Sequence, residues 1–145
     1  MKKAFTLVEV LLVMVIIAIL AAIVIVAINP ARQISQANNT QRTADVKTIL
    51  DAVGDYSLDN RGAYPANLSD TATVVGSGTT QIDICTDLVP TYIAAMPFDP
   101  TATDAQYTDC TDYDTGYTIV EDATSGRITV AAPTAELSEV ITATR

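Results

Sequence analysis

The chain of 145 residues contains no histidine, no tryptophan and only two cysteines. Without histidine the commonest general base is missing, and with it the usual pairing of a base with a nucleophile. A zinc-type site is also disfavoured, because two cysteines without histidine are too few ligands. We therefore expect no enzymatic activity, no catalytic residue and no resident cofactor.

Basic side chains are scarce, above all in the second half of the chain. After Gly62 only Arg127 and Arg145 are basic, against twelve acidic residues. Such an acidic surface repels phosphate backbones, so we expect no direct nucleic-acid binding. Aromatic side chains are absent between Phe5 and Tyr56, which excludes stacked rings along that stretch.

What the chain does have is a long apolar run from Phe5 to Ile28. About 19 residues from Val10 onward carry no charge, and as a helix they cover roughly the hydrocarbon core of a bilayer. Lys2 and Lys3 precede the run, so the positive-inside rule places the N-terminus in the cytoplasm. Everything after Ile28 then faces outward.

Glu9 is the single charged residue inside this run. An ionised carboxylate there costs about 2.5 kcal/mol or more unless it is paired. Cleavage after Ala4 would create a partner, because the new amino group of Phe5 is positive at neutral pH. We expect Glu9 to neutralise the amine of a neighbouring copy, since Phe5 and Glu9 of one chain would stack along one helix face with the amine pointing away.

The N-terminal sequence resembles that of type IV pilins and the related pseudopilins. The resemblance rests on a short basic leader, a small residue before Phe5, Glu9 at the fifth position after the cut, and the apolar run, in KKAFTLVEVLLVMVIIAILAAIVIVAINPARQ. It implies that a prepilin peptidase cuts between Ala4 and Phe5 and N-methylates Phe5. The family usually has glycine before the cut; because alanine is the next smallest side chain, we expect cutting at Ala4 as well.

The resemblance implies a major-type structural subunit of a type IV pilus, which self-associates through its apolar helix into a helical filament. The chain would meet the prepilin peptidase and the assembly machinery, first in the cytoplasmic membrane and then in an extracellular filament. Two alternatives stay open: the major pseudopilin of a type II secretion system, and a single-pass anchor for an acidic binding module that never polymerises. A secretory signal peptide fits less well, because its apolar core is shorter and lacks a glutamate.

The pattern predicts an α+β fold with one long N-terminal helix packed on a small antiparallel sheet. We expect a leader at 1–4, an apolar helix at 5–28, its amphipathic continuation at 29–59 and a head at 60–145. Pro30 should kink the helix without ending it, and Gly62 suits a helix stop. The apolar stripe of the continuation is formed by Val46, Ile49, Leu50, Val53 and Tyr56. Its other faces carry the polar residues Arg32, Gln33, Gln36, Arg42, Asp45, Lys47, Asp51 and Asp55.

In the head, 117–121 and 127–131 are rich in β-formers and flank a turn, which predicts a hairpin. A short edge at 106–107, and either a strand or a loose tail at 135–141, would complete a sheet of three or four strands. We expect 63–90 to be an irregular connector in which short strands or turns can occur. The side chains expected to anchor the connector and the loop after it are Tyr64, Leu68, Leu88, Tyr92, Ile93, Met96 and Phe98.

Cys85 and Cys110 lie in the segment predicted to face outward, where disulfides form. A bridge between them would constrain the unfolded head by roughly 3 kcal/mol; the alternative is two free thiols packed as small apolar groups. Calcium is a weaker possibility, because the spacing does not match an EF-hand loop. Its candidate ligands are Asp99, Asp104, Asp109, Asp112 and Asp114.

Overall fold

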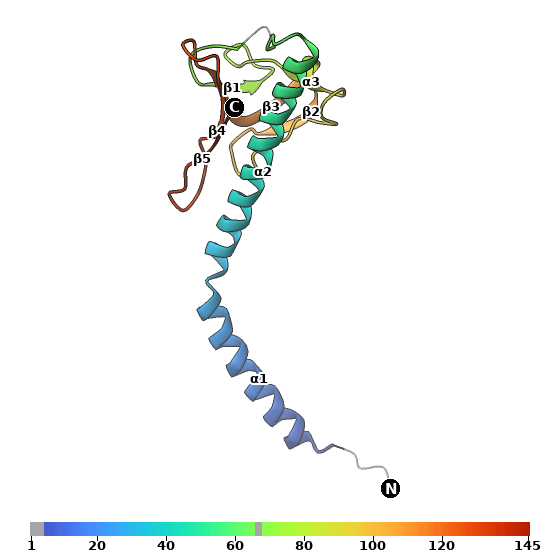
Figure 1. Cartoon of the computed structure of the whole chain (residues 1–145). Helices are drawn as coiled ribbons and strands as arrows, with labels where there is room; N and C mark the ends of the chain where they lie inside the picture. Colours follow the sequence, from blue (N-terminus) through green and yellow to red (C-terminus); the bar gives the residue numbers. More distant parts are fainter. Residues whose placement is uncertain (1–4, 66–67) are drawn as a thin grey trace. The chain divides into compact units, whose positions relative to one another are not determined.

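The computed structural model describes residues 5–65 and 68–145 and divides the chain after Ser35 into two compact units (Figure 1). The predicted leader, with Ala4, lies outside the described residues. The first unit contains α1 (Leu7–Ile28) and the start of α2 (Pro30–Asp59). The second unit contains the rest of α2, the short helix α3 (Cys85–Leu88) and a β-sheet.

The two long helices are separated by a single residue, Asn29. Asn29 has left-handed backbone angles, φ 49° and ψ 78°, which asparagine adopts more readily than most residues. Its side-chain oxygen also accepts a hydrogen bond of 3.4 Å from the backbone of Arg32, so it caps the start of α2. Pro30 occupies the first helical position, where its missing N–H is not needed. The interruption lies where it was predicted, but it is a break between two capped helices rather than a kink in one.

In the described part of the second unit, five antiparallel strands form one sheet. Their order is β1-β3-β4-β5, and β2 pairs with β3 as well. The predicted hairpin is confirmed, with Glu121 opposite Ile128 across β3 and β4. The strands are β1 (Thr73–Gly76), β2 (Gln106–Asp109), β3 (Asp112–Glu121), β4 (Ile128–Ala132) and β5 (Ile141–Thr144).

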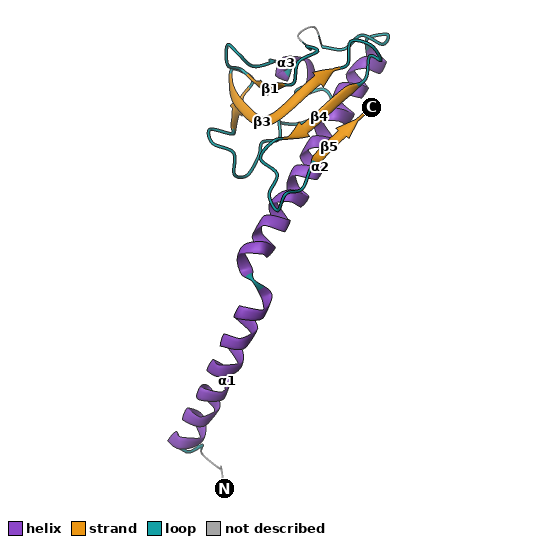
Figure 2. Cartoon of the chain, turned by 90° about the vertical axis from the view of Figure 1, so that its left-hand side faces the viewer, coloured by secondary structure: helices purple, strands orange, loops and turns teal. Residues whose placement is uncertain are grey.

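One face of the sheet packs against α2, which runs behind the strands in Figure 2. Buried residues alternate with less buried ones along β3 and β4, as expected when one face of a strand is covered. The apolar stripe on α2 is confirmed, although Tyr56 at its end is only half-buried. The main core side chains are Val46, Ile49, Leu50, Val53, Val75, Tyr117, Ile119, Ile128, Val130 and Ile141.

Two polar residues of α2 depart from the prediction. Arg42 and Asp45 were assigned to the solvent faces, yet both are buried. They precede Val46 and Ile49 by four positions, and residues four apart share one helix face. The buried stripe therefore continues toward the N-terminus of α2 with polar side chains in place of apolar ones.

In the described residues the sheet has five strands instead of three or four, because the connector expected at 63–90 contributes the strand β1; the same connector holds the short helix α3. The last strand begins at Ile141, while residues 133–140 form the loop between β4 and β5. Among the predicted anchors, Leu88 and Met96 are buried, whereas Phe98 is 45% exposed and does not anchor the loop.

Candidate functional site

Apart from Glu9 in its first turn, the surface of α1 is apolar on all sides. Every residue from Phe5 to Val26 is exposed, and the segment Leu7–Val26 has a mean hydropathy of 3.3. In the described part of the chain this is the one helix long and apolar enough to cross a membrane. Because a helix that is hydrophobic all round is not stable in water, α1 requires lipid or other helices around it.

The polar groups of this segment gather at its N-terminal end. Thr6 is the N-cap of α1, and its side-chain oxygen accepts a 3.3 Å hydrogen bond from the backbone N–H of Glu9. Thr6 and Glu9 stand at the two positions of a capping box, and the helix dipole favours a carboxylate in this first turn. The carboxylate of Glu9 is nonetheless exposed among apolar neighbours.

Phe5 precedes α1, because the helix begins at Leu7 after the extended backbone of Thr6. The prediction that Phe5 and Glu9 stack on one helix face is therefore wrong for this structure. The side chain of Phe5 is 78% exposed. The terminal segment thus presents an exposed ring and an exposed acid on either side of the Thr6 cap.

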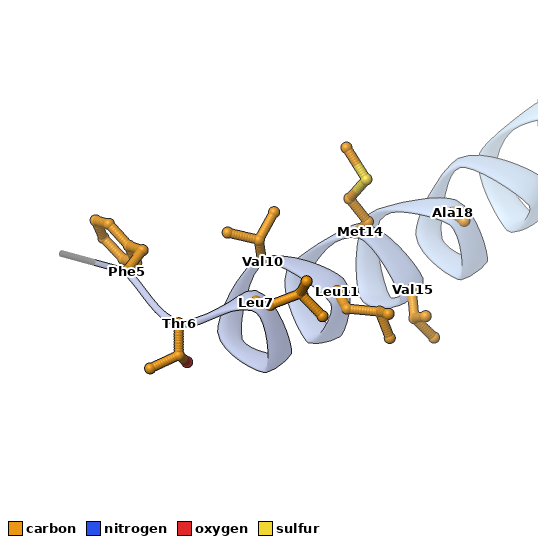
Figure 3. A pocket seen from close by; sticks show the side chains of 8 residues that line it. All are labelled: Phe5, Thr6, Leu7, Val10, Leu11, Met14, Val15 and Ala18. Atoms are coloured by element: carbon orange, nitrogen blue, oxygen red, sulfur yellow. The ribbon is translucent and has the colours of Figure 1, made fainter.

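A shallow groove runs along the first turns of α1 (Figure 3). It lies between two rows of side chains that repeat every four residues, the spacing of the ridges that interdigitate when helices pack. One row holds Leu7, Leu11 and Val15, and the other holds Val10, Met14 and Ala18. The groove can accept a ridge of another apolar helix.

The head is held together partly by the predicted disulfide. Cys85 and Cys110 are bonded, with their Cα atoms 5.3 Å apart. The bond joins the start of α3 to the turn between β2 and β3. The two cysteines are 25 residues apart in the sequence, so the bond restricts the freedom of that loop in the unfolded chain.

A buried polar cluster lies between α2 and the loops of the head, and sequence reasoning missed it. The guanidinium of Arg42 is fully buried and donates to both carboxylate oxygens of Asp99, at 2.8 and 3.2 Å. It also donates to Asn39 at 2.8 Å and to Glu136 at 3.0 Å. We call Asn39, Arg42, Asp99 and Glu136 the Arg42 cluster. Its members come from three separate parts of the chain, which it fastens together.

The cluster keeps Asp99 ionised. Burial by itself raises the pKa of this carboxyl, but hydrogen bonds from Arg42, Thr134 and two backbone amides lower the pKa to about 2. Asp45, one turn further along α2, behaves oppositely: burial raises its pKa, although Tyr117 and Gln41 donate hydrogen bonds of 2.8 Å to it. Both carboxyl groups are buried and hydrogen-bonded inside the head, so their role is structural.

Gly116 allows the loop with Asp99 to approach β3. Its φ is +70°, and a Cβ there would come within 2.9 Å of the Cβ of Ala102 and 3.2 Å of that of Asp99. The backbone N–H of Asp99 donates to the carbonyl of Thr115 at 2.9 Å. Only glycine combines this conformation with this close approach.

The aspartates considered for calcium do not converge. Asp99 pairs with Arg42, and Asp114 accepts from Gln81 at 2.5 Å. Asp109 accepts from Thr111 within its own turn at 2.7 Å. In the part of the chain that the structure describes, no group of three or more acidic or cysteine side chains is placed to hold a metal ion.

An exposed apolar helix of membrane-spanning length, followed by a second helix packed on a small antiparallel sheet, is the layout of a pilin-like subunit. Residues 1–25 match the prokaryotic N-terminal methylation motif, so the chain carries the signal motif of type IV pilins and pseudopilins. Proteins with this motif have a structural rather than an enzymatic role. No curated protein and no solved structure matches the chain.

Proposed function

We propose that this chain is a major structural subunit of a type IV pilus. Its precursor inserts in the cytoplasmic membrane, is cut between Ala4 and Phe5, is methylated on the amine of Phe5, and polymerises through α1. The observation that carries the proposal is the exposed carboxylate of Glu9 at the start of an otherwise uncharged apolar helix. In an anchor that never polymerises, this carboxylate would serve only to cap α1 and to complement its dipole.

Pairing between copies accounts for Glu9. A carboxylate in apolar surroundings is destabilising by itself, and a charge of opposite sign offsets that cost. The amine of a processed Phe5 in a neighbouring copy supplies such a charge. Every copy except the one at the tip then has a subunit ahead of it whose amine needs a partner. The presence of Glu9 therefore fits a subunit of the filament body better than a tip subunit.

Packing between copies of α1 would supply the remaining contacts. Moving an apolar helix from lipid into a bundle gains little hydrophobic free energy, since lipid tails are as apolar as the side chains. The gain comes from close packing of ridges into grooves such as that beside Leu7, Leu11 and Val15. Such packing allows neighbouring helices to be shifted along each other in several ways. The pair of Glu9 with the Phe5 amine of a neighbouring copy would select one of these arrangements.

The experiment compares filaments from the unmodified chain with those from three variants, by electron microscopy and N-terminal sequencing. Unmodified filaments should begin at a methylated Phe5. Glu9→Gln keeps the shape and removes the charge, so it should insert stably and form no filaments; Glu9→Asp should retain some assembly. Thr6→Ala is the matched control, because it removes the cap of α1 and leaves the charge.

Three outcomes contradict the proposal. The first is filaments that begin at Met1, and the second is normal assembly by Glu9→Gln. The third is equal loss in Thr6→Ala and Glu9→Gln, which would show that any disturbance of the first turn of α1 stops assembly and that the charge of Glu9 has no specific role. Fibres confined to the periplasm would instead identify a pseudopilin, and a surface head without any filament would identify an anchored binding module.

A further inference from the structure

The loop between β4 and β5 contains a turn with an unexpected sequence. Leu137 and Ser138 follow each other with φ of 59° and 58°, and the turn is closed by a 3.1 Å hydrogen bond from the N–H of Glu139 to the carbonyl of Glu136. Turns with positive φ at both central residues favour Asn-Gly, because other side chains are strained there. Stability alone therefore does not account for a leucine at this position.

The loop is held in this conformation by contacts at its base. The side-chain amide of Asn39 donates to the carbonyl of Glu136 at 2.8 Å, and the N–H of Glu136 donates back to Asn39 at 2.9 Å. Arg42 donates to the carboxylate of Glu136 at 3.0 Å, and Asn39 also donates to Glu139 at 3.1 Å. The Arg42 cluster thus presents a preformed loop.

The loop exposes apolar side chains instead of burying them. Leu137 is 44% exposed and Val140 is 87% exposed, with the exposed acid Glu139 between them. Backbone strain that is maintained by surrounding structure is typical of binding sites. A preformed apolar loop also loses little conformational freedom on binding, which favours association.

We propose that this loop docks on the start of α2 in a second copy of the chain, around Ile34. Ile34 is 62% exposed, and with Pro30 it forms an exposed apolar face of that helix. The face begins one residue after α1, so it continues the surface through which the copies are proposed to polymerise. The exposed Arg32 lies two residues from both Pro30 and Ile34, hence toward the other side of the helix, and its positive charge favours the approach of the acidic loop at long range only.

The charge of the loop argues against other occupants. Glu136 and Glu139 flank its apolar tip, and such a surface is repelled by the anionic lipids of a membrane. The contact joins two different patches, so repeating it adds copies in one direction and suits a filament. The inference rests on the proposed function, because it specifies how the heads of a polymer meet.

Cysteine cross-linking tests the contact. Two differently tagged full-length copies, one with Ile34→Cys and one with Val140→Cys, are expressed together, and sheared filaments are oxidised. We expect about tenfold more mixed dimer than in a control that pairs Ile34→Cys with Ala123→Cys, because a docked pair of thiols has a high effective concentration. Ala123 is exposed in the turn between β3 and β4.

A second variant separates docking from folding. Leu137→Asn with Ser138→Gly supplies the residues that the turn favours and removes the apolar tip. We expect the melting temperature of the head to rise by roughly 4 °C or more, while filament yield falls several-fold. A purely structural leucine would give the opposite result, a less stable head with unchanged assembly.

The outcomes separate this inference from the proposed function. Normal filaments without the mixed dimer would overturn the docking contact alone, and so would dimers between two Val140→Cys copies, which indicate a loop-to-loop contact. Filament yield unaffected by the Leu137 and Ser138 changes would also overturn it. Absence of filaments from the unmodified chain would overturn the proposed function, and the docking contact with it.

Discussion

Replacing Arg42 by methionine should destabilise the head strongly. The substitution keeps most of the apolar stem and leaves the carboxylate of Asp99 buried without its cation. Removing one partner of a buried ion pair destabilises a protein by about 3–5 kcal/mol. This is a large part of the stability of a small domain, which is about 5–15 kcal/mol.

The acid dependence of this effect follows from Asp99. Its pKa is lowered from 3.8 to about 2, so the folded state binds the proton more weakly than the unfolded state. The resulting stabilisation, about 2 kcal/mol, is present above pH 4 and is lost as the pH falls toward 2. Arg42→Met removes the main cause of the low pKa. The difference in stability between the two proteins should therefore narrow between pH 4 and pH 2.

Tyrosine fluorescence during guanidinium unfolding of the full chain in detergent measures this effect. All six tyrosines lie between positions 56 and 117, so the signal reports the second unit alone. Lys47→Met on the exposed face of α2 is the control, because an exposed ion pair such as that with Asp51 contributes about 0–1 kcal/mol. A loss below about 1 kcal/mol in Arg42→Met, or an unchanged difference in acid, would refute the role of the cluster.

Three further variants probe the head in the same assay. Tyr117→Phe removes the 2.8 Å hydrogen bond to buried Asp45, so the free energy of unfolding should fall by about 1–3 kcal/mol, and no change would show that water replaces the hydroxyl. Gly116→Ala should destabilise by more than about 1 kcal/mol, because its φ of +70° and its close neighbours both oppose a side chain; an unaltered midpoint would contradict this. Replacing Cys85 and Cys110 by serine opens a bridge between residues 25 apart and should lower stability by about 3 kcal/mol, whereas equal midpoints with and without reductant in the unmodified chain would show that the bridge contributes nothing.

The parts of the fold that were predictable follow from local patterns. The apolar run predicts α1 by composition, the stripe through Val46 and Val53 predicts the packed half of α2, and two β-rich segments around a turn predict the hairpin. Each signal lies within one short segment. The N-cap also has a local signal, because Thr6 and Glu9 have the spacing of a capping box.

The Arg42 cluster could not be predicted in the same way. Asn39, Arg42 and Asp45 continue the apolar stripe at steps of three and four residues, and this spacing was the available signal. Polar residues on a stripe are more often solvated, so their burial depends on partners elsewhere in the sequence. Those partners, Asp99 and Glu136, lie 57 and 94 residues from Arg42, and no local pattern connects them.

Two free energies decide whether the docking loop is preformed: the backbone strain of its turn, and the stabilisation by the contacts at its base. Left-handed backbone costs about 1–2 kcal/mol per residue, hence about 2–4 kcal/mol for Leu137 and Ser138 together. Four hydrogen bonds between the base of the loop and Asn39 or Arg42 hold this conformation, and each contributes about 0.5–1.5 kcal/mol, hence about 2–6 kcal/mol together. Because the second term is at least comparable with the first, the free subunit can keep the strained turn before it meets a partner. A weakened cluster should then allow the turn to relax, so that assembly is impaired in variants whose heads still fold.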